Sequence, residues 1–208
     1  MKKIFTILAL TIVFNVNAQL APVTESGNTG QRLTTSNTSN HGDIGSNAVD
    51  LSNSSSASTT RGATGDYSIA MGRYTTASGS RSTAMGGYTT ASGNYSTAMG
   101  DSTEASGNYS TAMGYSTEAS GSFSTAMGYS TEANGFHSTA MGYETTASDY
   151  GSLVIGQYNS SGSTATSADS FSTANTAFVI GNGTGTGVDA SDAFKVMFNG
   201  DTYVSSSL

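Results

Sequence analysis

The sequence predicts an all-β protein: a parallel β-roll or solenoid with 14-residue coils and two short strands per coil, followed by a C-terminal β-hairpin. Three observations support this prediction. Ala-Met-Gly recurs every 14 residues, a second alanine keeps the same spacing, and each period divides into two similar halves of seven residues. A repeat this strict indicates one elongated unit, stabilised by neighbouring coils rather than by a globular core.

The repeated residues form two series with the same period. The apolar residues of the first series are Met71, Met85, Met99, Met113, Met127, Met141 and, in the next place, Ile155. The alanines of the second series are Ala77, Ala91, Ala105, Ala119, Ala133 and Ala147. Seven residues are too few for a helix and a turn. They suit a short strand and a tight corner, at which glycine supplies unusual backbone angles.

The inward face of each coil is expected to carry only small side chains. In both halves of the coil from Tyr109 to Ser122, the second residue is Ser or Thr, the fourth is Ala and the sixth is Gly. Asp149, in the last coil, is the one departure from this pattern. Alternate residues of a strand share a face. The two strands of a coil can therefore lie against each other across a very thin interior.

The two outward faces are expected to differ. The first half presents Thr and Met after an aromatic residue such as Tyr95, Tyr109 or Phe123, whereas the second half presents Ser, Thr and Glu. Coils stacked about 4.8 Å apart give a Met and Ile column roughly 30 Å tall. Burying six Met side chains is worth on the order of 10 kcal/mol before association costs, and such a strip is unusual on a soluble monomer.

We therefore predict that the Met and Ile column, with these three aromatic residues, is an oligomer interface. The alternative is a Met-studded surface that stays wet or is covered by the terminal segments.

Two segments of one coil carry a resemblance to a known family. Ser110-Thr-Ala-Met-Gly114 and Thr117-Glu-Ala-Ser-Gly121 match the head repeats of trimeric autotransporter adhesins, the YadA-like heads, position by position. The resemblance covers Tyr67 to Gly156. It implies a left-handed parallel β-roll, three chains packed side by side, and a head displayed at the cell outer membrane. Such a head attaches to a surface, to matrix or to other cells through an extracellular protein or glycan. The handedness and the number three come from the resemblance alone.

Residues 1–18 are predicted to be a secretory signal peptide. Lys2 and Lys3 precede the apolar run from Ile4 to Phe14, and Val16-Asn17-Ala18 offers small residues for cleavage. That run is too short to span a bilayer, so no direct membrane span is expected in this chain. We expect a secreted or cell-surface protein. Its stability cannot depend on disulfides, because the sequence contains no Cys.

The remaining segments divide by composition. Residues 19–52 read as a polar lead-in and N-terminal cap, in which Gln19 to Asn40 is flexible or loosely strapped and Ile44, Val49 and Leu51 cover the open end of the roll. The rival interpretation is that this segment is ordered only in the oligomer. Residues 53–157 are the head repeats and 158–176 an inserted loop, which either contacts a ligand or ties neighbouring chains together.

Residues 177–208 hold a last coil, a Gly/Thr linker and the hairpin. Ala177-Phe-Val-Ile-Gly181 restores the coil motif, and Asn199-Gly200 is a strong two-residue turn signal between two apolar runs. In related fibre proteins, similar hairpins lead towards a stalk or a C-terminal folding domain. No heptads and no membrane β-barrel anchor follow here, which leaves the means of attachment to the cell open.

The sequence argues against several other functions. A formal net charge of −7 gives no basic surface for nucleic acid. We predict no enzyme and no cofactor, since no nucleophile lies beside a base and no phosphate loop or His-Glu-x-x-His is present. The repeated Glu104, Glu118 and Glu132 suggest a solvated face or, less simply, a cation site. They also interrupt the Thr array that an ice-binding solenoid needs. The outward Thr83, Thr97, Thr111, Thr125 and Thr139 still leave an ice-binding β-solenoid open as an alternative. His137 lacks a second ligand, so no metal site is expected.

The purely structural alternative also stays open. A fibre or stalk segment without binding activity of its own would show the same repeats.

Overall fold

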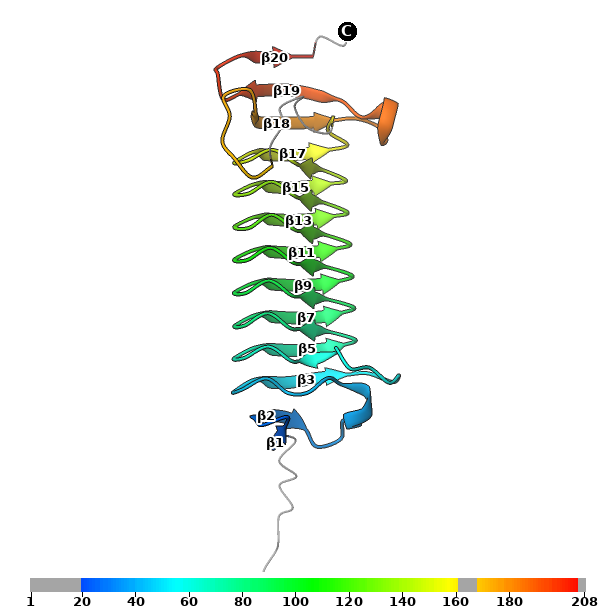
Figure 1. Cartoon of the computed structure of the whole chain (residues 1–208). Coiled ribbons are helices and arrows are strands. Elements are labelled where there is room, and N and C mark those ends of the chain that lie inside the picture. Colours follow the sequence, from blue (N-terminus) through cyan, green and yellow to red (C-terminus); the bar gives the residue numbers. More distant parts are fainter. Residues whose placement is uncertain (1–19, 161–167, 206–208) are drawn as a thin grey trace, which may run out of the picture.

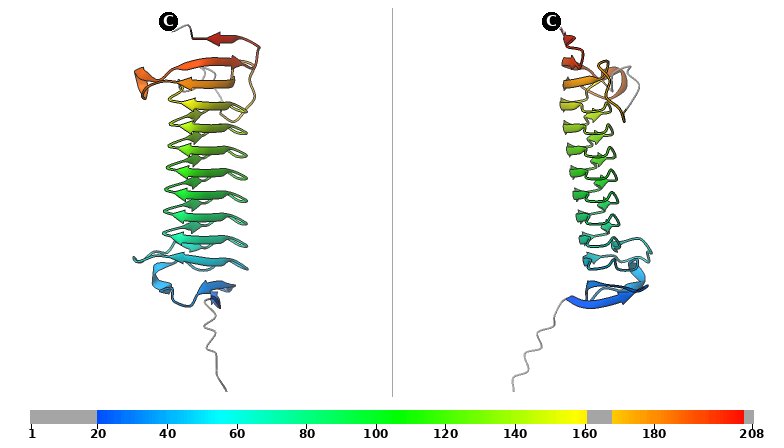
Figure 2. Two further views of the ribbon diagram at one scale, coloured as in Figure 1. Left: turned by 180° about the vertical axis from the view of Figure 1, so that it is seen from behind. Right: turned by 60° about the vertical axis from the view of Figure 1, so that its left-hand side comes forward.

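The computed structural model describes residues 20–160 and 168–205, which form a rod of stacked coils (Figure 1). One face is a 13-stranded sheet in the order β1-β2-β3-β5-β7-β9-β11-β13-β15-β17-β18-β19-β20, and the other is a 7-stranded sheet running from β4 to β16. The side view in Figure 2 shows how thin the space between these two layers is. The predicted all-β parallel solenoid with 14-residue coils is confirmed.

The first half of each coil supplies a five-residue strand to the large sheet. These strands are β5 (Ile69–Arg73), β7 (Thr83–Gly87), β9 (Thr97–Asp101), β11 (Thr111–Tyr115), β13 (Thr125–Tyr129), β15 (Thr139–Tyr143) and β17 (Leu153–Gln157). Each pairs in parallel with the residues 14 positions away, so that Met113 lies beside Met99 and Met127. Identical residues therefore form columns along the rod.

The second half of each coil supplies a two-residue strand to the small sheet. These strands are β4 (Gly62–Ala63), β6 (Thr76–Ala77), β8 (Thr90–Ala91), β10 (Glu104–Ala105), β12 (Glu118–Ala119), β14 (Glu132–Ala133) and β16 (Thr146–Ala147). They also pair in parallel and in register, as Glu104 does with Glu118.

Small side chains fill the interior, as predicted. The alanines of both halves are fully buried from Ala63 to Ala147, and Val154 and Val179 continue the same core. The Ser of the first half and the Thr of the second half are buried as well, for example Ser110 and Thr117. No charged side chain enters this core between residues 63 and 148, because two strands this close leave no room for one.

The two repeated glycines play different parts, which corrects the prediction that both point inward. Gly107, in the second half, is buried, and a Cβ there would lie 2.1 Å from the carbonyl oxygen of Gly121. Gly114, in the first half, is exposed, has φ of 128° and would also meet a backbone oxygen. Gly107 is therefore required by the close approach of the neighbouring backbone. Gly114 is required both by such an approach and by its left-handed backbone conformation.

The tight corners are made by residues other than glycine. Tyr109 and Ser116, at the first position of each half, have φ of 59° and 54°, and the equivalent residues of the other coils share this conformation. A left-handed backbone is costly for a residue with a Cβ. The prediction that glycine supplies the unusual angles of the corners therefore holds only in part.

The N-terminal segment is more ordered than the flexible lead-in that its composition predicts. Strands β1 (Leu20–Glu25) and β2 (Asn28–Leu33) form an antiparallel hairpin, and β2 pairs in parallel with β3 (Val49–Asn53). A short 3-10 helix, η1 (Thr38–Asn40), lies between them. This hairpin closes the lower end of the rod in Figure 1.

The three apolar residues assigned to the cap do not act together. Ile44 is fully buried and ends the core, as a cap residue should. Val49 and Leu51 instead pair with Ile69 and Met71 of the large sheet. Alternation along β3 points the buried Asp50 inward and leaves Val49 and Leu51 on the outward face.

The C-terminal end continues the large sheet with a change of direction. Strand β18 (Thr176–Asn182) pairs in parallel with β17, which places Val179 beside Val154 as the restored motif predicts. Strands β19 (Asp192–Met197) and β20 (Thr202–Val204) follow antiparallel, with Gly200 at φ of 93° in the turn of the predicted hairpin. The linker holds a second 3-10 helix, η2 (Gly187–Asp189).

In the described part of the chain, no helix is long and apolar enough to cross a membrane.

Candidate oligomer interface

The predicted interface residues lie together on the outward face of the large sheet. Met71 and Met85 are 37% exposed, and Met99, Met113, Met127, Met141 and Ile155 are half-buried. Strand pairing adds Leu51 before this column and Ile180 after it. We call this surface, from Leu51 to Ile180, the Met face. Leu51 was predicted to belong to the cap, and the 14-residue spacing that identifies the other members is broken between Leu51 and Met71.

A second column on the same face runs beside the methionines. It contains the Thr at the third position of the central coils, such as Thr97, Thr111 and Thr125, all of them half-buried. Apolar residues replace Thr at both ends, where Ile69 is 38% exposed and Leu153 is 37% exposed. The Met face therefore offers thioethers and methyl groups in straight rows, with no charged side chain in either column.

The predicted aromatic residues form a ladder at one edge of this face. The ring centroids of Tyr95 and Tyr109 lie 4.8 Å apart with planes 6° apart, and Tyr109 stacks equally closely on Phe123. His137 continues the ladder at 4.9 Å from Phe123. The rings stack face to face, so that their edges are the parts that remain exposed. Stacking of this kind helps to offset the cost of the left-handed backbone at these residues.

Sequence analysis missed a second aromatic ladder at the opposite edge. Tyr115, Tyr129 and Tyr143 stack with centroids 5.1 Å and 4.9 Å apart. Tyr158 ends the row edge-on to Tyr143. Hydrogen bonding to Tyr143, partial desolvation and the nearby Glu144 raise the pKa of Tyr158 to about 12, so its phenol stays neutral. The signal was the tyrosine repeated at the seventh position of three consecutive coils.

The opposite sheet has a different chemistry. Glu104, Glu118 and Glu132 stand in one exposed column. Partial burial of the Glu118 carboxyl, together with repulsion from the carboxylates of Glu104 and Glu132, raises its pKa. No group of three or more His, Cys, Asp or Glu residues that suits a metal ion occurs in residues 20–160 and 168–205. This face is polar and acidic, whereas the Met face is apolar.

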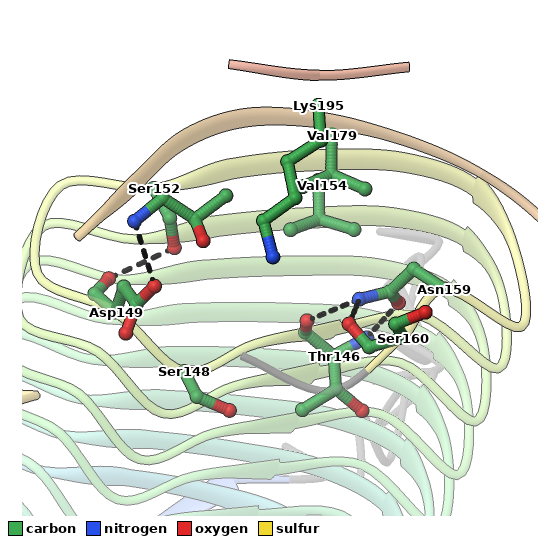
Figure 3. Close-up of a pocket in the computed structure, with 10 residues that line it drawn as sticks. Thr146, Ser148, Asp149, Ser152, Val154, Asn159, Ser160, Val179 and Lys195 are labelled. Carbon is green, nitrogen blue, oxygen red and sulfur yellow. Dashed lines mark hydrogen bonds between the residues drawn. The ribbon is translucent and has the colours of Figure 1, made fainter. Parts of the chain in front are cut away.

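The end of the core near β18 is closed by single side chains (Figure 3). The Asn159 amide accepts a hydrogen bond of 2.8 Å from the Thr146 N–H and donates one of 2.9 Å to the Thr146 carbonyl, as a further strand would. Asp149 accepts a hydrogen bond of 2.8 Å from the Thr176 N–H. Lys195 lies over Val179, opposite it in the sheet. The cavity between them measures about 10 Å³, which holds a water at most.

Two wider hollows lie near the ends of the rod. One, of about 290 Å³, is bounded by Tyr158 and Thr186, and the other, of about 430 Å³, by Ser26 and His41. In the second hollow, the His41 ring is held inside the core, where its Nδ1 lies 3.1 Å from the Asp50 carboxylate and 3.3 Å from the Ser52 hydroxyl, both of them buried. In contrast to these local hollows, the Met face and its two aromatic ladders extend along the rod.

The family comparison agrees with this architecture. The family model described as the YadA head domain repeat matches residues 63–89, 77–103, 91–117, 105–131 and 133–159. Among curated proteins, none matches the chain. The matched windows begin at β4 and end just after β17, so they cover the uniform coils and neither end of the rod. The coils of residues 63–159 are YadA-like head repeats.

Proposed function

We propose that this chain is an adhesin-like head that assembles as a homotrimer through the Met face and attaches the cell to a surface, to matrix or to other cells. The observation that carries the proposal is the continuous apolar column from Leu51 to Ile180. Its side chains are half-buried or exposed in the single chain, on one flat side of a rod whose other side is acidic. Contiguous apolar strips of this length on exported proteins mark protein–protein contacts.

The family match supports the trimer and the surface location. YadA head repeats belong to trimeric autotransporter adhesins, which are displayed at the cell surface. The predicted signal peptide, residues 1–18, lies outside the described residues, so secretion also belongs to this proposal. No catalytic role is proposed, because the repeats are those of adhesin heads.

The first experiment measures the mass of the mature protein in solution by light scattering. We expect three times the mass of one chain. Met113→Glu should dissociate the assembly, because each chain would bring a carboxylate into the centre of an apolar contact. Met113→Leu keeps the apolar volume and is the matched control, and Glu118→Ala tests the opposite face. A monomeric wild type, or equal effects of Met113→Glu and Glu118→Ala, would contradict the proposed interface.

The second experiment tests attachment itself. Cells or beads coated with the trimer should adhere to extracellular matrix more strongly than beads coated with Met113→Glu monomer, since three identical chains bind multivalently. A trimer that adheres to nothing would instead be a structural fibre segment. The unbroken pairing of equivalent residues from coil to coil is the observation that favours this second function.

A further inference from the structure

Three of the arginines lie in a short part of the rod. Of the seven Lys and Arg residues, Lys2 and Lys3 lie outside the described part, Arg32 is buried and Lys195 covers the C-terminal end of the core. The other three are Arg61, Arg73 and Arg81, all within the first coils. Among the described residues, none of these three has a carboxylate within 4.0 Å.

Two of these arginines form a layered cluster with two tyrosines at one edge of the rod. The Arg61 guanidinium lies 4.4 Å from the centroid of the Tyr74 ring, and the Arg73 guanidinium lies 4.6 Å from Tyr74 and 5.3 Å from Tyr88. The two rings are 5.0 Å apart. We call Arg61, Arg73, Tyr74 and Tyr88 the arginine–tyrosine cluster. Cation–π contact holds the guanidinium groups in place without neutralising their charge.

The cluster keeps donors available for a ligand. Arg61 uses Nη1 to reach the hydroxyls of Ser54 and Ser56 at 2.9 Å and 2.7 Å. Its Nε and Nη2 make no hydrogen bond with any other described residue. Arg73 and Tyr88 are exposed. The pKa of Tyr74 is lowered by hydrogen bonds between the Tyr74 phenol and the side chains of Ser55 and Arg73, as expected where the local potential is positive.

The tyrosine column stops directly after the cluster. The next residue in the column of Tyr74 and Tyr88 is Ser102, and Tyr88 makes no ring contact with any later coil in the described part of the chain. No ring therefore stacks on Tyr88 from the following coil, and its side chain is 49% exposed. An exposed aromatic ring beside unpaired guanidinium groups is suited to a sugar ring that carries an anionic group.

We propose that the arginine–tyrosine cluster is a binding site for acidic polysaccharide, in which Arg61 and Arg73 pair with sulfate or carboxylate groups and Tyr88 stacks on the sugar. This inference deepens the proposed attachment function and rests on it, because it names the chemistry of the surface that the head recognises. A trimer presents the cluster three times, so weak single sites add up to firm attachment.

The charge of the following coils selects against stiff double-stranded nucleic acid laid along the rod. Asp101 pairs with Gly87 in the next coil, and Glu104, Glu118 and Glu132 follow along the rod. Double-stranded nucleic acid lying along the rod would meet this acidic stretch, whereas an acidic sugar residue fits within the few coils that carry arginine. The site therefore favours a saccharide chain over nucleic acid.

Arg81 provides a matched control within the same protein. It lies at the other edge, 5.2 Å from the rings of both Tyr67 and Tyr95, and donates to the Tyr95 hydroxyl. It is exposed like Arg73, but Asp66 lies one coil earlier on that edge, with its carbonyl bound to the Arg81 N–H. Replacing Arg81 changes the net charge of the chain by the same amount without altering the cluster.

The test measures binding of the trimer to immobilised dextran sulfate and polygalacturonate, with neutral dextran, DNA and phosphatidylglycerol vesicles as comparisons. We expect dextran sulfate or polygalacturonate to bind more tightly than all three, and to release as salt rises. The first two probes distinguish sulfate from carboxylate. Arg73→Gln should weaken binding about tenfold, and the double variant Arg61→Gln/Arg73→Gln further, because charge-assisted hydrogen bonds are lost.

The control variant Arg81→Gln should change binding less than about twofold, since it leaves the cluster intact. Equal loss in Arg81→Gln and Arg73→Gln, binding no tighter than to neutral dextran, or tighter binding to DNA or vesicles would overturn the proposal. So would dissociation of the trimer by Arg73→Gln, which would place Arg73 in the interface. Because Arg61 also holds the loop at Ser54 and Ser56, the single variants Arg73→Gln and Tyr88→Ala test the site independently of that loop.

The two proposals fail separately. If the wild type is a trimer that adheres to matrix, and Arg73→Gln adheres equally well, the polysaccharide site is wrong and the adhesin function stands. If the wild type is monomeric or adheres to nothing, the adhesin function is wrong whether or not dextran sulfate binds.

Discussion

The coils and the N-terminal end of the rod are stabilised in opposite ways. In the coils, the core is built from Ala, Ser, Thr and Gly, and every strand pairs with a copy of itself. At the N-terminal end, the core contains the charged side chains of Arg32 and Asp50, both almost fully buried. Their ion pair spans 3.1 Å from Nε to the carboxylate.

The difference shows what a repeat can and cannot supply. A coil in the middle of the stack satisfies its backbone hydrogen-bonding groups by pairing with similar coils on both sides. The first coil has no such neighbour, so it needs side chains that no other coil has. Arg32 also pairs with Glu25 at 2.8 Å and donates to the Gly42 carbonyl at 2.8 Å. One guanidinium thus ties the hairpin, a loop and β3 together.

The largest expected effect on stability comes from a substitution that disturbs the stacking of the uniform coils. In Gly107→Ala, the new methyl group would overlap the carbonyl oxygen of Gly121, which belongs to the backbone and cannot move without separating two coils. We expect a loss of about 3 kcal/mol or more in the free energy of unfolding, measured by denaturant unfolding. Gly87→Ala is the matched control, because a Cβ there meets only the flexible Asp101 carboxylate. A loss in Gly87→Ala as large as in Gly107→Ala would refute the close-approach explanation.

A smaller and more local effect is expected at the N-terminal end. Asp50→Asn removes the charge that faces Arg32 and His41, and should cost roughly 3 kcal/mol in the stability of that end. Hydrogen exchange should rise in β2 and β3 while β9 to β13 stay protected, because a solenoid unfolds from its ends. Uniform loss of protection along the rod would mean that the two regions are not independent.

The pH dependence of this pair follows from the Asp50 carboxyl. Burial alone would raise the pKa of Asp50, but hydrogen bonds from His41 and Ser52 outweigh it and lower the pKa below its usual value of 3.8. A carboxyl with a lowered pKa stabilises the folded state above its unfolded pKa, and that stability is lost as the pH falls through the folded pKa. The difference in the free energy of unfolding between wild type and Asp50→Asn should therefore have its full value near pH 7 and shrink below about pH 4.

The smallest expected effect concerns the acidic column of the coils. Because the Glu118 pKa is raised in the folded protein, its charge destabilises the stack at neutral pH. Glu118→Gln should raise the free energy of unfolding by about 0.5 kcal/mol at pH 7, because it removes repulsion between like charges on adjacent strands. The gain should vanish once the pH falls below the unfolded pKa of Glu. Thermal unfolding at both pH values checks this, and a loss of stability at pH 7 would show that Glu118 makes a favourable contact instead.

Much of the coil region could be predicted from the sequence, because its structure is local. The strict 14-residue period requires equal coils, and small residues at alternate positions identify the inward face. The position of Met113 on an outward face follows from the same alternation, as does the burial of Ala112 and Ala119. The hairpin at Asn199-Gly200 was predictable for a similar reason, since its turn residues and flanking strands are contiguous in the chain.

The ends and the surface columns depended on contacts that no period encodes. Arg32 and Asp50 are 18 residues apart and meet only because β2 lies beside β3. Asn159 closes the small sheet by imitating a strand, and nothing in its neighbours predicts this. Likewise, Arg61 and Arg73 gather on one edge because the loop after β3 returns to the first full coil.

The sequence by itself determined the repeat, the strands and the chemistry of each face, because every one of these properties is repeated and rests on neighbours a fixed distance away. Only the tertiary structure decided how the stack ends and which charged residues meet. Those features occur once in the molecule, and each depends on residues brought together by the folding of the whole chain rather than by the period of a coil.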